Sequence, residues 1–190
     1  MQGNLFNGEP LSATPTPDLP LQPLQLRAWQ QRIHDHQAAL FRGDRPTNSQ
    51  GDLFANASQD PATGLDPMAL TPLPLTFWRW PDSPHQGPAI YLVLDRPSDL
   101  DQPLLLYVGE TGAADRRWKG DHDCKAYLSA YGEALQRCGL PHQLSIRFCT
   151  DAPSDTRARR RMEQQLIQRW QPPFNKETRQ RWATPFTADV

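Results

Sequence analysis

The runs AIYLVL at residues 89–94 and LLLYVG at residues 104–109 decide the fold of this chain. Both are short and apolar, and each carries one tyrosine, Tyr91 in the first and Tyr107 in the second. Apolar runs of this length, separated by a polar turn region, are typical of adjacent buried strands. Gly109 closes the second run. Because glycine takes most backbone angles at no steric cost, we expect the chain to leave the strand sharply there.

Around these two runs, the pattern continues with helices and one more strand. Residues 142–149 alternate apolar and polar side chains, which is the period of a half-buried strand. Residues 154–170 carry an apolar residue at every fourth position, as an amphipathic helix does. The expected order is strand 89–95, strand 103–109, helix 113–120, helix 124–138, strand 143–149 and helix 154–170. The sequence thus predicts an α/β fold, a small three-stranded antiparallel sheet flanked by helices.

Three polar residues follow the strands at spacings that suggest a chemical site. Arg117 lies eight residues after Gly109, Glu163 lies at the edge of the apolar stripe of a basic helix, and Asn175 ends a Pro-Pro-Phe-Asn loop. A carboxylate is a hard oxygen ligand of the kind that Mg²⁺ uses together with waters and phosphate oxygens. Arginine offers donors that are always charged. Together with the two tyrosines, these residues match a set that could cut a phosphodiester bond.

In this order and spacing the residues resemble the GIY-YIG nuclease family. Ala89-Ile90-Tyr91 stands for the first signature triplet and Tyr107-Val108-Gly109 for the second, and the resemblance covers about residues 86–186. It implies a divalent-metal-dependent DNA endonuclease, with a role in DNA repair or recombination, that binds Mg²⁺ or Mn²⁺. The catalytic set that it implies is Tyr91, Tyr107, Arg117, Glu163 and Asn175, with the metal at Glu163.

The resemblance also assigns roles within this set. Tyr107 is the general base, and Tyr91 beside it orients it or shares that role. An unperturbed tyrosine has a pKa of about 10, so this role requires a nearby cation or metal. Asn175 helps to hold the site or the phosphate.

The sequence departs from the family pattern at several positions. Ala89 stands for the first glycine, the two signature tyrosines are sixteen residues apart, Glu110 stands where some members have lysine, and Asp121 stands where tyrosine or histidine is frequent. These departures leave a second interpretation open, a non-catalytic DNA-binding or clamp-associated adaptor on the same fold.

Each candidate also has a purely structural alternative. Buried tyrosines often bridge the core and the solvent, and Arg117 is close in sequence to Asp115. Glu163 and Arg159, four residues apart on a helix, are spaced for an ion pair worth a few tenths of a kcal/mol. Only their joint order and spacing favour catalysis.

The formal net charge of −1 hides a contrast along the chain. Residues 157–181 hold 8 basic and 2 acidic side chains, so positive charge gathers around two of the candidate catalytic residues. Such a patch suits a phosphate backbone, although a solvated helix face is the alternative. The predicted DNA contacts are Arg116, Lys119, Arg157, Arg159, Arg160, Arg161 and Lys176.

The first 85 residues have a different composition and are expected to form a flexible Pro/Gln-rich extension. Thirteen of the 20 prolines precede residue 89, and residues 1–24 and 43–75 predict mostly disordered linker. Residues 24–41 lack proline and predict one helix. Phe77, Trp78 and Trp80 form an aromatic cluster that is expected to pack onto the domain, with base stacking as the alternative.

A short pattern, Gln-x-x-Leu-Phe, occurs three times in this half, at residues 2–6, 37–41 and 50–54. The first and last copies look like the peptide with which bacterial replication and repair proteins bind the sliding clamp, since two apolar anchors and a directional glutamine suit a pocket. The alternative is that they dock onto their own domain. The middle copy lies on the predicted helix, where core packing is the simpler interpretation. The predicted clamp contacts are Gln2, Leu5, Phe6, Gln50, Leu53 and Phe54.

The remaining patterns bear on the compartment and on metals. No apolar run is long enough to span a membrane, and the first ten residues lack the pattern of a secretory signal. Three cysteines argue against a disulfide framework and fit a reducing cytoplasm. The chain has no Cys-x-x-Cys pair, so a structural zinc site is not favoured.

Overall fold

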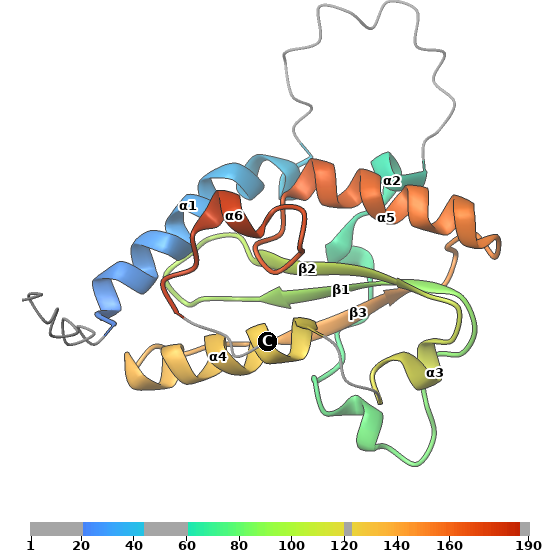
Figure 1. Ribbon diagram of the computed structural model, residues 1–190, viewed down its shortest axis with the longest axis horizontal. Helices are drawn as coiled ribbons and strands as arrows, with labels where there is room; N and C mark the ends of the chain where they lie inside the picture. Colours follow the sequence, from blue (N-terminus) through green and yellow to red (C-terminus); the bar gives the residue numbers. More distant parts are fainter. Residues whose placement is uncertain (1–20, 44–60, 120–122, 187–190) are drawn as a thin grey trace, which may run out of the picture.

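A computed structural model of the chain describes residues 21–43, 61–119 and 123–186. Its centre is a three-stranded antiparallel sheet in the order β2-β1-β3, with β1 at Ala89–Asp95, β2 at Leu104–Thr111 and β3 at Ser145–Cys149 (Figure 1). Every residue of β1 is buried, which explains why this strand is apolar without alternation. The predicted α/β class and antiparallel sheet are confirmed.

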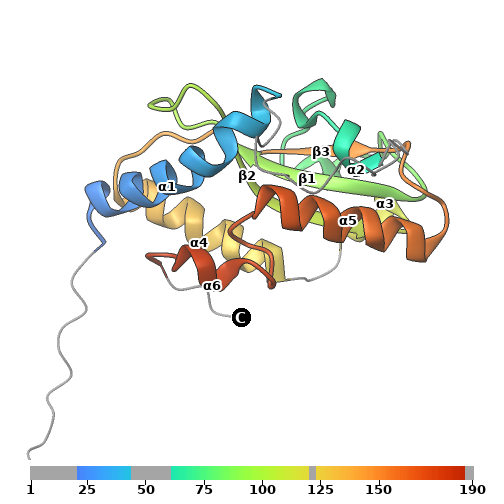
Figure 2. The ribbon, with the colours of Figure 1, turned by 90° about the horizontal axis from the view of Figure 1, so that it is seen from above.

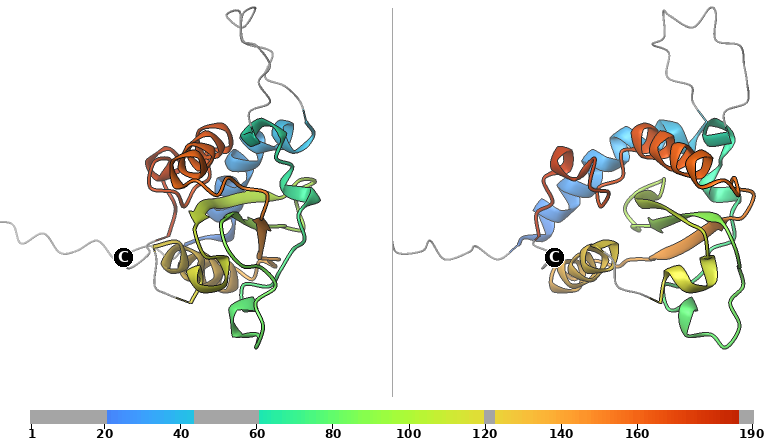
Figure 3. Two further views of the ribbon diagram at one scale, coloured as in Figure 1. Left: turned by 90° about the vertical axis from the view of Figure 1, so that its right-hand side faces the viewer. Right: turned by 45° about the vertical axis from the view of Figure 1, so that its right-hand side comes forward.

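Helices cover both faces of the sheet. α4, at Asp123–Arg137, and α5, at Thr156–Trp170, lie on opposite faces (Figure 3). Alternate residues of β1 therefore belong to two cores: Tyr91 and Val93 pack toward α4, whereas Ile90 and Leu92 pack toward α5. Short helices complete the fold: α2 at Pro61–Gly64, η1 at Pro67–Ala69, η2 at Phe77–Arg79, α3 at Ala114–Arg117 and α6 at Arg179–Trp182.

The N-terminal half contributes to the core instead of standing apart from it. α1, at Pro23–Phe41, lies against β2, α4 and α5 (Figure 2). Trp29 of α1 is 1% exposed and stacks on Phe174 with ring centroids 6.1 Å apart. The physical reason is that the apolar face of α1 covers core surface that the three strands and α4 leave open. Much of residues 1–85, which were expected to be a flexible extension, is therefore packed.

The proline-rich segment before β1 is also fixed in place, contrary to the expectation of linker over its whole length. Leu73 exchanges both backbone hydrogen bonds with Ile146 of β3, at 2.8 and 2.9 Å. The buried Arg147 donates through Nη1 to three carbonyls of residues 67–70. Proline removes donors but not acceptors, so such a segment can still be held by its carbonyl groups. Residues 1–20 and 44–60 lie outside the described residues.

Two side-chain amides satisfy the outer edge of β2. Gln37 of α1 accepts from the Leu105 amide at 2.8 Å and donates to the Leu105 carbonyl at 3.0 Å. Asn175 does the same with Val108, at 2.9 and 2.8 Å. Each carboxamide thus replaces the peptide group of a neighbouring strand, and the edge is not left as an open ladder.

Two further observations concern membrane-spanning helices and cysteines. Within the described part of the chain, no helix combines the length and the apolar character that crossing a membrane requires. The described residues include all three cysteines, and none of these forms a disulfide bond.

Candidate active site

Tyr91 and Gly109 face each other across the first two strands and set the shape of the site. They are direct partners in the β1–β2 ladder, and a Cβ at position 109 would overlap the Tyr91 ring. The expectation that Gly109 lets the chain leave the strand is wrong, because β2 continues to Thr111. Glycine is needed here for space, because the Tyr91 ring crosses over the opposite strand.

The two signature tyrosines and Arg117 form one cluster. The rings of Tyr91 and Tyr107 stack with centroids 5.9 Å apart. Arg117 Nε donates to the Tyr91 hydroxyl at 3.2 Å. The neighbouring Asp115 pairs with Arg116 instead, at 3.8 Å, so the alternative of an Arg117–Asp115 surface pair is not what the structure shows.

Glu163 reaches the same end of the sheet from α5. Its Oε1 accepts from the backbone amide of Glu110 at 3.1 Å, which ties the helix to β2. Among the described residues, its other carboxylate oxygen has no hydrogen-bond partner. Burial raises the pKa of Glu163 from the ordinary 4.5 to about 7, and the carboxylates of Glu110 and Glu177 add to the rise. The site therefore holds a half-buried carboxylate that lacks a strong cationic partner.

Glu110 is paired with two arginines of α5. Arg159 Nε donates to it at 2.7 Å, and Arg160 Nε lies 3.5 Å from its other oxygen. Arg159 is only 3% exposed and also donates to the carbonyls of Pro153 and Ser154. Its prediction as a DNA contact is therefore wrong, and so is the Glu163–Arg159 ion pair. The sequence did contain a signal for the burial of Arg159, because Arg159 shares one helical face with Met162 and Leu166.

Tyr91 and Tyr107 differ in access and in partners. Tyr91 is fully buried, whereas Tyr107 is half-buried and reaches the surface. Burial raises the pKa of both hydroxyl groups, and at Tyr91 the nearby Arg117 opposes this rise. At Tyr107 the Tyr91 hydroxyl and the Glu163 carboxylate raise the pKa further. To act as a general base, Tyr107 therefore requires added positive charge next to Glu163.

Asn175 belongs to the frame of the site. It is 3% exposed, and both polar atoms of its side chain bind Val108, the residue between Tyr107 and Gly109. Of its two predicted roles, the structure supports holding the site, and it leaves no amide group for a phosphate.

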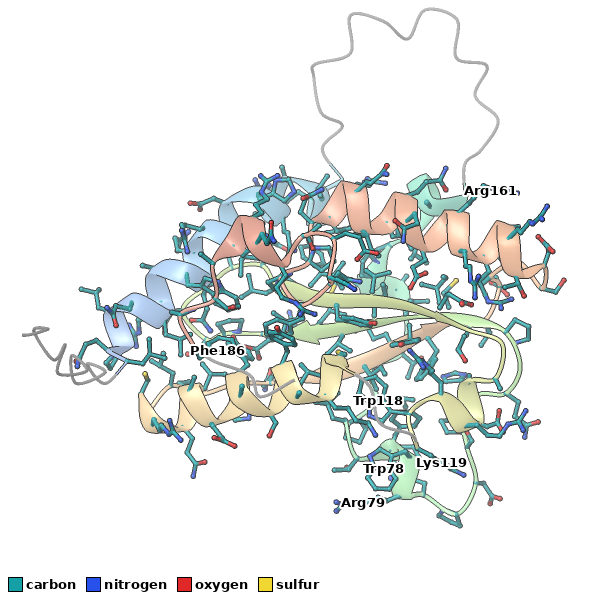
Figure 4. The ribbon with its side chains drawn as sticks, in the orientation of Figure 1. Trp78, Arg79, Trp118, Lys119, Arg161 and Phe186 are labelled. Carbon is teal, nitrogen blue, oxygen red and sulfur yellow. The ribbon has the colours of Figure 1, made fainter. Side chains whose placement is uncertain are left out.

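The remaining predicted DNA contacts lie at the surface. Arg157, Arg160 and Arg161 are exposed and line a shallow groove on α5 together with three glutamines. Figure 4 shows Arg161 on α5. Arg116 and Lys119 are exposed at α3, and Lys176 is exposed after the Pro-Pro-Phe-Asn loop. α3 and the first turns of α5 lie at the same end of the sheet (Figure 1). This end also holds the tyrosines and Glu163.

Glu163 and Glu110 are the two carboxylates at this end of the sheet that bear on the binding of a divalent cation. No group of three or more His, Cys, Asp or Glu side chains that could hold a metal occurs among the described residues. Glu163, with Glu110 beside it, instead offers the one or two carboxylates that Mg²⁺ uses when waters and substrate phosphates complete its shell. A carboxylate with a raised pKa and an unused oxygen fits such an ion. Glu163 therefore fits the role of a carboxylate ligand, whereas the Glu110 carboxylate is already paired with Arg159 and Arg160.

The copies of Gln-x-x-Leu-Phe divide in two. In the middle copy, Gln37 is buried against β2 and the Phe41 ring lies 4.6 Å from that of Trp170, as the core interpretation predicts. The predicted clamp contacts, Gln2, Leu5, Phe6, Gln50, Leu53 and Phe54, lie outside the described residues, as does Asp121.

Comparison of the chain with protein-family models, curated proteins and solved structures found no match. The function of this chain must therefore be inferred from its own residues and their geometry.

Proposed function

We propose that this chain is a divalent-metal-dependent endonuclease that hydrolyses phosphodiester bonds in DNA, with a domain similar to those of GIY-YIG nucleases. The observation that carries the proposal is the convergence of Tyr91, Tyr107, Arg117 and Glu163 at one end of the sheet. Four side chains from β1, β2, α3 and α5 meet there, with Arg117 bonded to Tyr91 and Glu163 bonded to the backbone of β2.

Arg117 is suited to stabilise charge on a phosphate. Among the described residues only its Nε is engaged, and the side chain is exposed. Its two terminal nitrogens are therefore available to phosphate oxygens, in the forked geometry that arginine offers. The hydrogen bond to Tyr91 fixes the guanidinium, so little reorganisation is needed during the reaction.

Glu163 is the residue that would hold the cation, with Glu110 next to it. When bound, a divalent cation supplies charge neutralisation at the phosphate and a more acidic water. The Glu110 amide fixes one oxygen of Glu163, and the other has no hydrogen-bond partner among the described residues. Arg159 keeps the Glu110 carboxylate in place, and this buried arginine is a positioning residue in the proposal.

Tyr107 is the tyrosine that can meet a water, because Tyr91 is fully buried. In the proposed division of roles, Tyr107 first loses its own proton to solvent and, as the phenolate, accepts the proton of the attacking water. Tyr91 orients Tyr107 and is itself held by Arg117. The positive charge that the metal site adds would offset the carboxylate that raises the pKa of Tyr107.

The DNA backbone would lie along the exposed face of α5. Arg157, Arg160 and Arg161 contribute three positive charges beside the groove, close in sequence to Glu163. Phosphate contacts of this kind give affinity without sequence information. Replacing all three with serine is expected to weaken binding to every DNA sequence and to reduce its salt dependence by about one unit of slope for each lost contact.

The test is cleavage by the purified full-length protein. The substrates are plain duplex, nicked, branched and single-stranded DNA, each with Mg²⁺, with Mn²⁺ or with EDTA. We expect cleavage of at least one substrate with either metal and none with EDTA. Binding without cleavage of any substrate would instead support the DNA-binding adaptor.

A second proposal concerns the partner of the N-terminal half, and the repeated Gln-x-x-Leu-Phe pattern favours it. Peptides covering residues 2–6 or 50–54 are expected to bind a bacterial sliding clamp in the cytoplasm, weakly when each is alone. Because the anchors supply the energy, Leu53→Ala combined with Phe54→Ala should abolish binding of the second peptide. Two copies on one chain could gain from effective concentration.

A further inference from the structure

The segment before β1 carries an aromatic and cationic surface that the proposed chemistry does not use. We call it the η2 platform; it consists of Trp78, Arg79 and Trp80, with Lys125 of α4. Phe77 anchors the segment: it is 2% exposed and meets Phe148 of β3 edge to face at 5.4 Å. Trp80, by contrast, is 44% exposed, and it is one of only two large exposed hydrophobic side chains in the described part of the chain.

The cations of the platform are arranged around indole rings. Arg79 lies over the Trp78 ring at 5.0 Å from its centroid, and Lys125 lies 5.7 Å from the same centroid. The prediction that this aromatic cluster packs onto the domain is confirmed for Phe77, which is buried, and for Trp78, which is partly buried against the same core. Trp80 lies two residues further on and mostly faces solvent.

The platform continues directly into the candidate active site. Lys125 lies 5.9 Å from the Trp118 ring as well, and Trp118 meets Tyr91 edge to face at 5.8 Å. Trp118 follows Arg117, whose Nε binds the Tyr91 hydroxyl. Figure 4 shows Trp118 and Lys119 at the end of α3, next to Trp78 and Arg79 of η2. A single aromatic residue thus separates the platform from the tyrosine cluster.

We propose that the η2 platform binds an unpaired nucleotide, with its base stacked on tryptophan and its phosphate neutralised by Arg79 and Lys125. The inference rests on the proposed nuclease function and names its substrate class: DNA with single-stranded or unpaired nucleotides beside the bond to be cut. The exposed face of α5 would hold the backbone on the other side of the site.

An unpaired base is the occupant that this chemistry fits. An exposed indole ring such as that of Trp80, next in sequence to the cationic Arg79, is a combination that suits a single strand, because every base has a face that can stack and every nucleotide carries a phosphate. A base within a duplex has both faces occupied by its neighbours, so a duplex can offer only its phosphates.

The test is a binding experiment that does not depend on cleavage. Full-length protein carrying Glu163→Gln is titrated in EDTA with a fluorescent single strand, a duplex with a single-stranded tail, and a plain duplex. Trp80→Ala is expected to weaken binding of the first two by about tenfold or more while changing duplex binding less than twofold. Trp80→Phe should restore most of the loss. Leu24→Ala, which removes the other large exposed hydrophobic side chain, 77% exposed on α1, is the control and should change nothing.

A second measurement asks whether a base is the partner of Trp80. Abasic nucleotides are placed one at a time along the tail. At one position the missing base should cost as much as Trp80→Ala, and the two losses should not add. Equal losses for duplex and single strand, or fully additive losses at every position, would overturn the stacking proposal. Failure of the wild-type protein to cleave any DNA would overturn the nuclease function instead, and the binding titrations distinguish the two outcomes.

Discussion

Asp95 and Glu163 are two carboxylates at opposite ends of the sheet, and burial raises the pKa of both. Asp95 is fully buried, and both its oxygens accept hydrogen bonds, one from Tyr131 at 2.8 Å and one from the Gln143 amide at 2.8 Å. Glu163 is half-buried and uses one oxygen only. A raised pKa therefore does not by itself mark a reactive group. The group that retains unused hydrogen-bonding capacity at an open site is the candidate.

The largest expected effect is the difference in cleavage rate between variants of Glu163 and of Asp95. Glu163→Gln should lower the rate of cleavage by at least about 10³-fold, because it removes the charge that holds the metal. The folded structure and binding of DNA in EDTA should remain. Asp95→Asn, the matched control, should keep the rate of the folded protein within a few-fold. Single-turnover cleavage of the best substrate measures both, and an active Glu163→Gln protein would show that the site is misassigned.

The next effect tests whether the reactive end depends on close packing across β1 and β2. Gly109→Ala places a Cβ where the Tyr91 ring lies, so the ring must move away from Arg117. Misplacement of this kind by about 1 Å can cost about 10²-fold in rate. Gly132→Ala, in α4, is the control, since a Cβ there meets nothing within 4 Å. Cleavage rates that are equal for the two variants would contradict the packing argument.

The pH dependence of cleavage gives a smaller effect. The carboxylate form of Glu163 binds the metal, and its pKa of about 7 means that this form falls about tenfold for each pH unit below that value. At low Mg²⁺ the rate should fall accordingly, and raising Mg²⁺ should move the midpoint to lower pH because the metal competes with the proton. A midpoint that ignores Mg²⁺ would mean that another group controls the profile.

The smallest effects concern stability, and their signs should be opposite. Asp95→Asn replaces an acceptor with a donor that faces either Tyr131 or the Gln143 amide, so unfolding should become easier by roughly 1–3 kcal/mol. In Glu163→Gln the Oε1 contact survives, and the ionisation penalty disappears. That penalty grows as the pH rises from 4.5 to about 7, so above pH 7 the variant should gain about 1 kcal/mol after allowance for solvent screening. Urea unfolding at pH 8 measures the free energy of unfolding of both variants. Stabilisation of both would contradict the predicted opposite signs.

The sheet could be predicted from local sequence because its signals are local. β1 and β2 are apolar runs of strand length, and α5 has a clear stripe with Asp155 at its N-cap, where Oδ1 accepts from the Ala158 amide at 2.8 Å. The same stripe placed Glu163 at the edge of the buried face. The sequence analysis did not predict that Arg159 is buried while its neighbouring arginines in α5 are exposed. The charge of a side chain does not reveal whether a partner such as Glu110 lies within reach.

The sequence by itself determined the number and order of the strands, the helices beside them and the set of polar residues that meet at one end. Tertiary structure alone decided that α1 completes the core, that Gly109 makes room for Tyr91, and that Gln37 and Asn175 close the edge of β2. The physical reason is the range of the interactions. Strand and helix patterns repeat over a few residues. The buried amides of β2 are instead satisfied by groups 67 or 68 positions away in the chain, and the carboxylates of Asp95 and Glu163 by groups 36, 48 and 53 positions away.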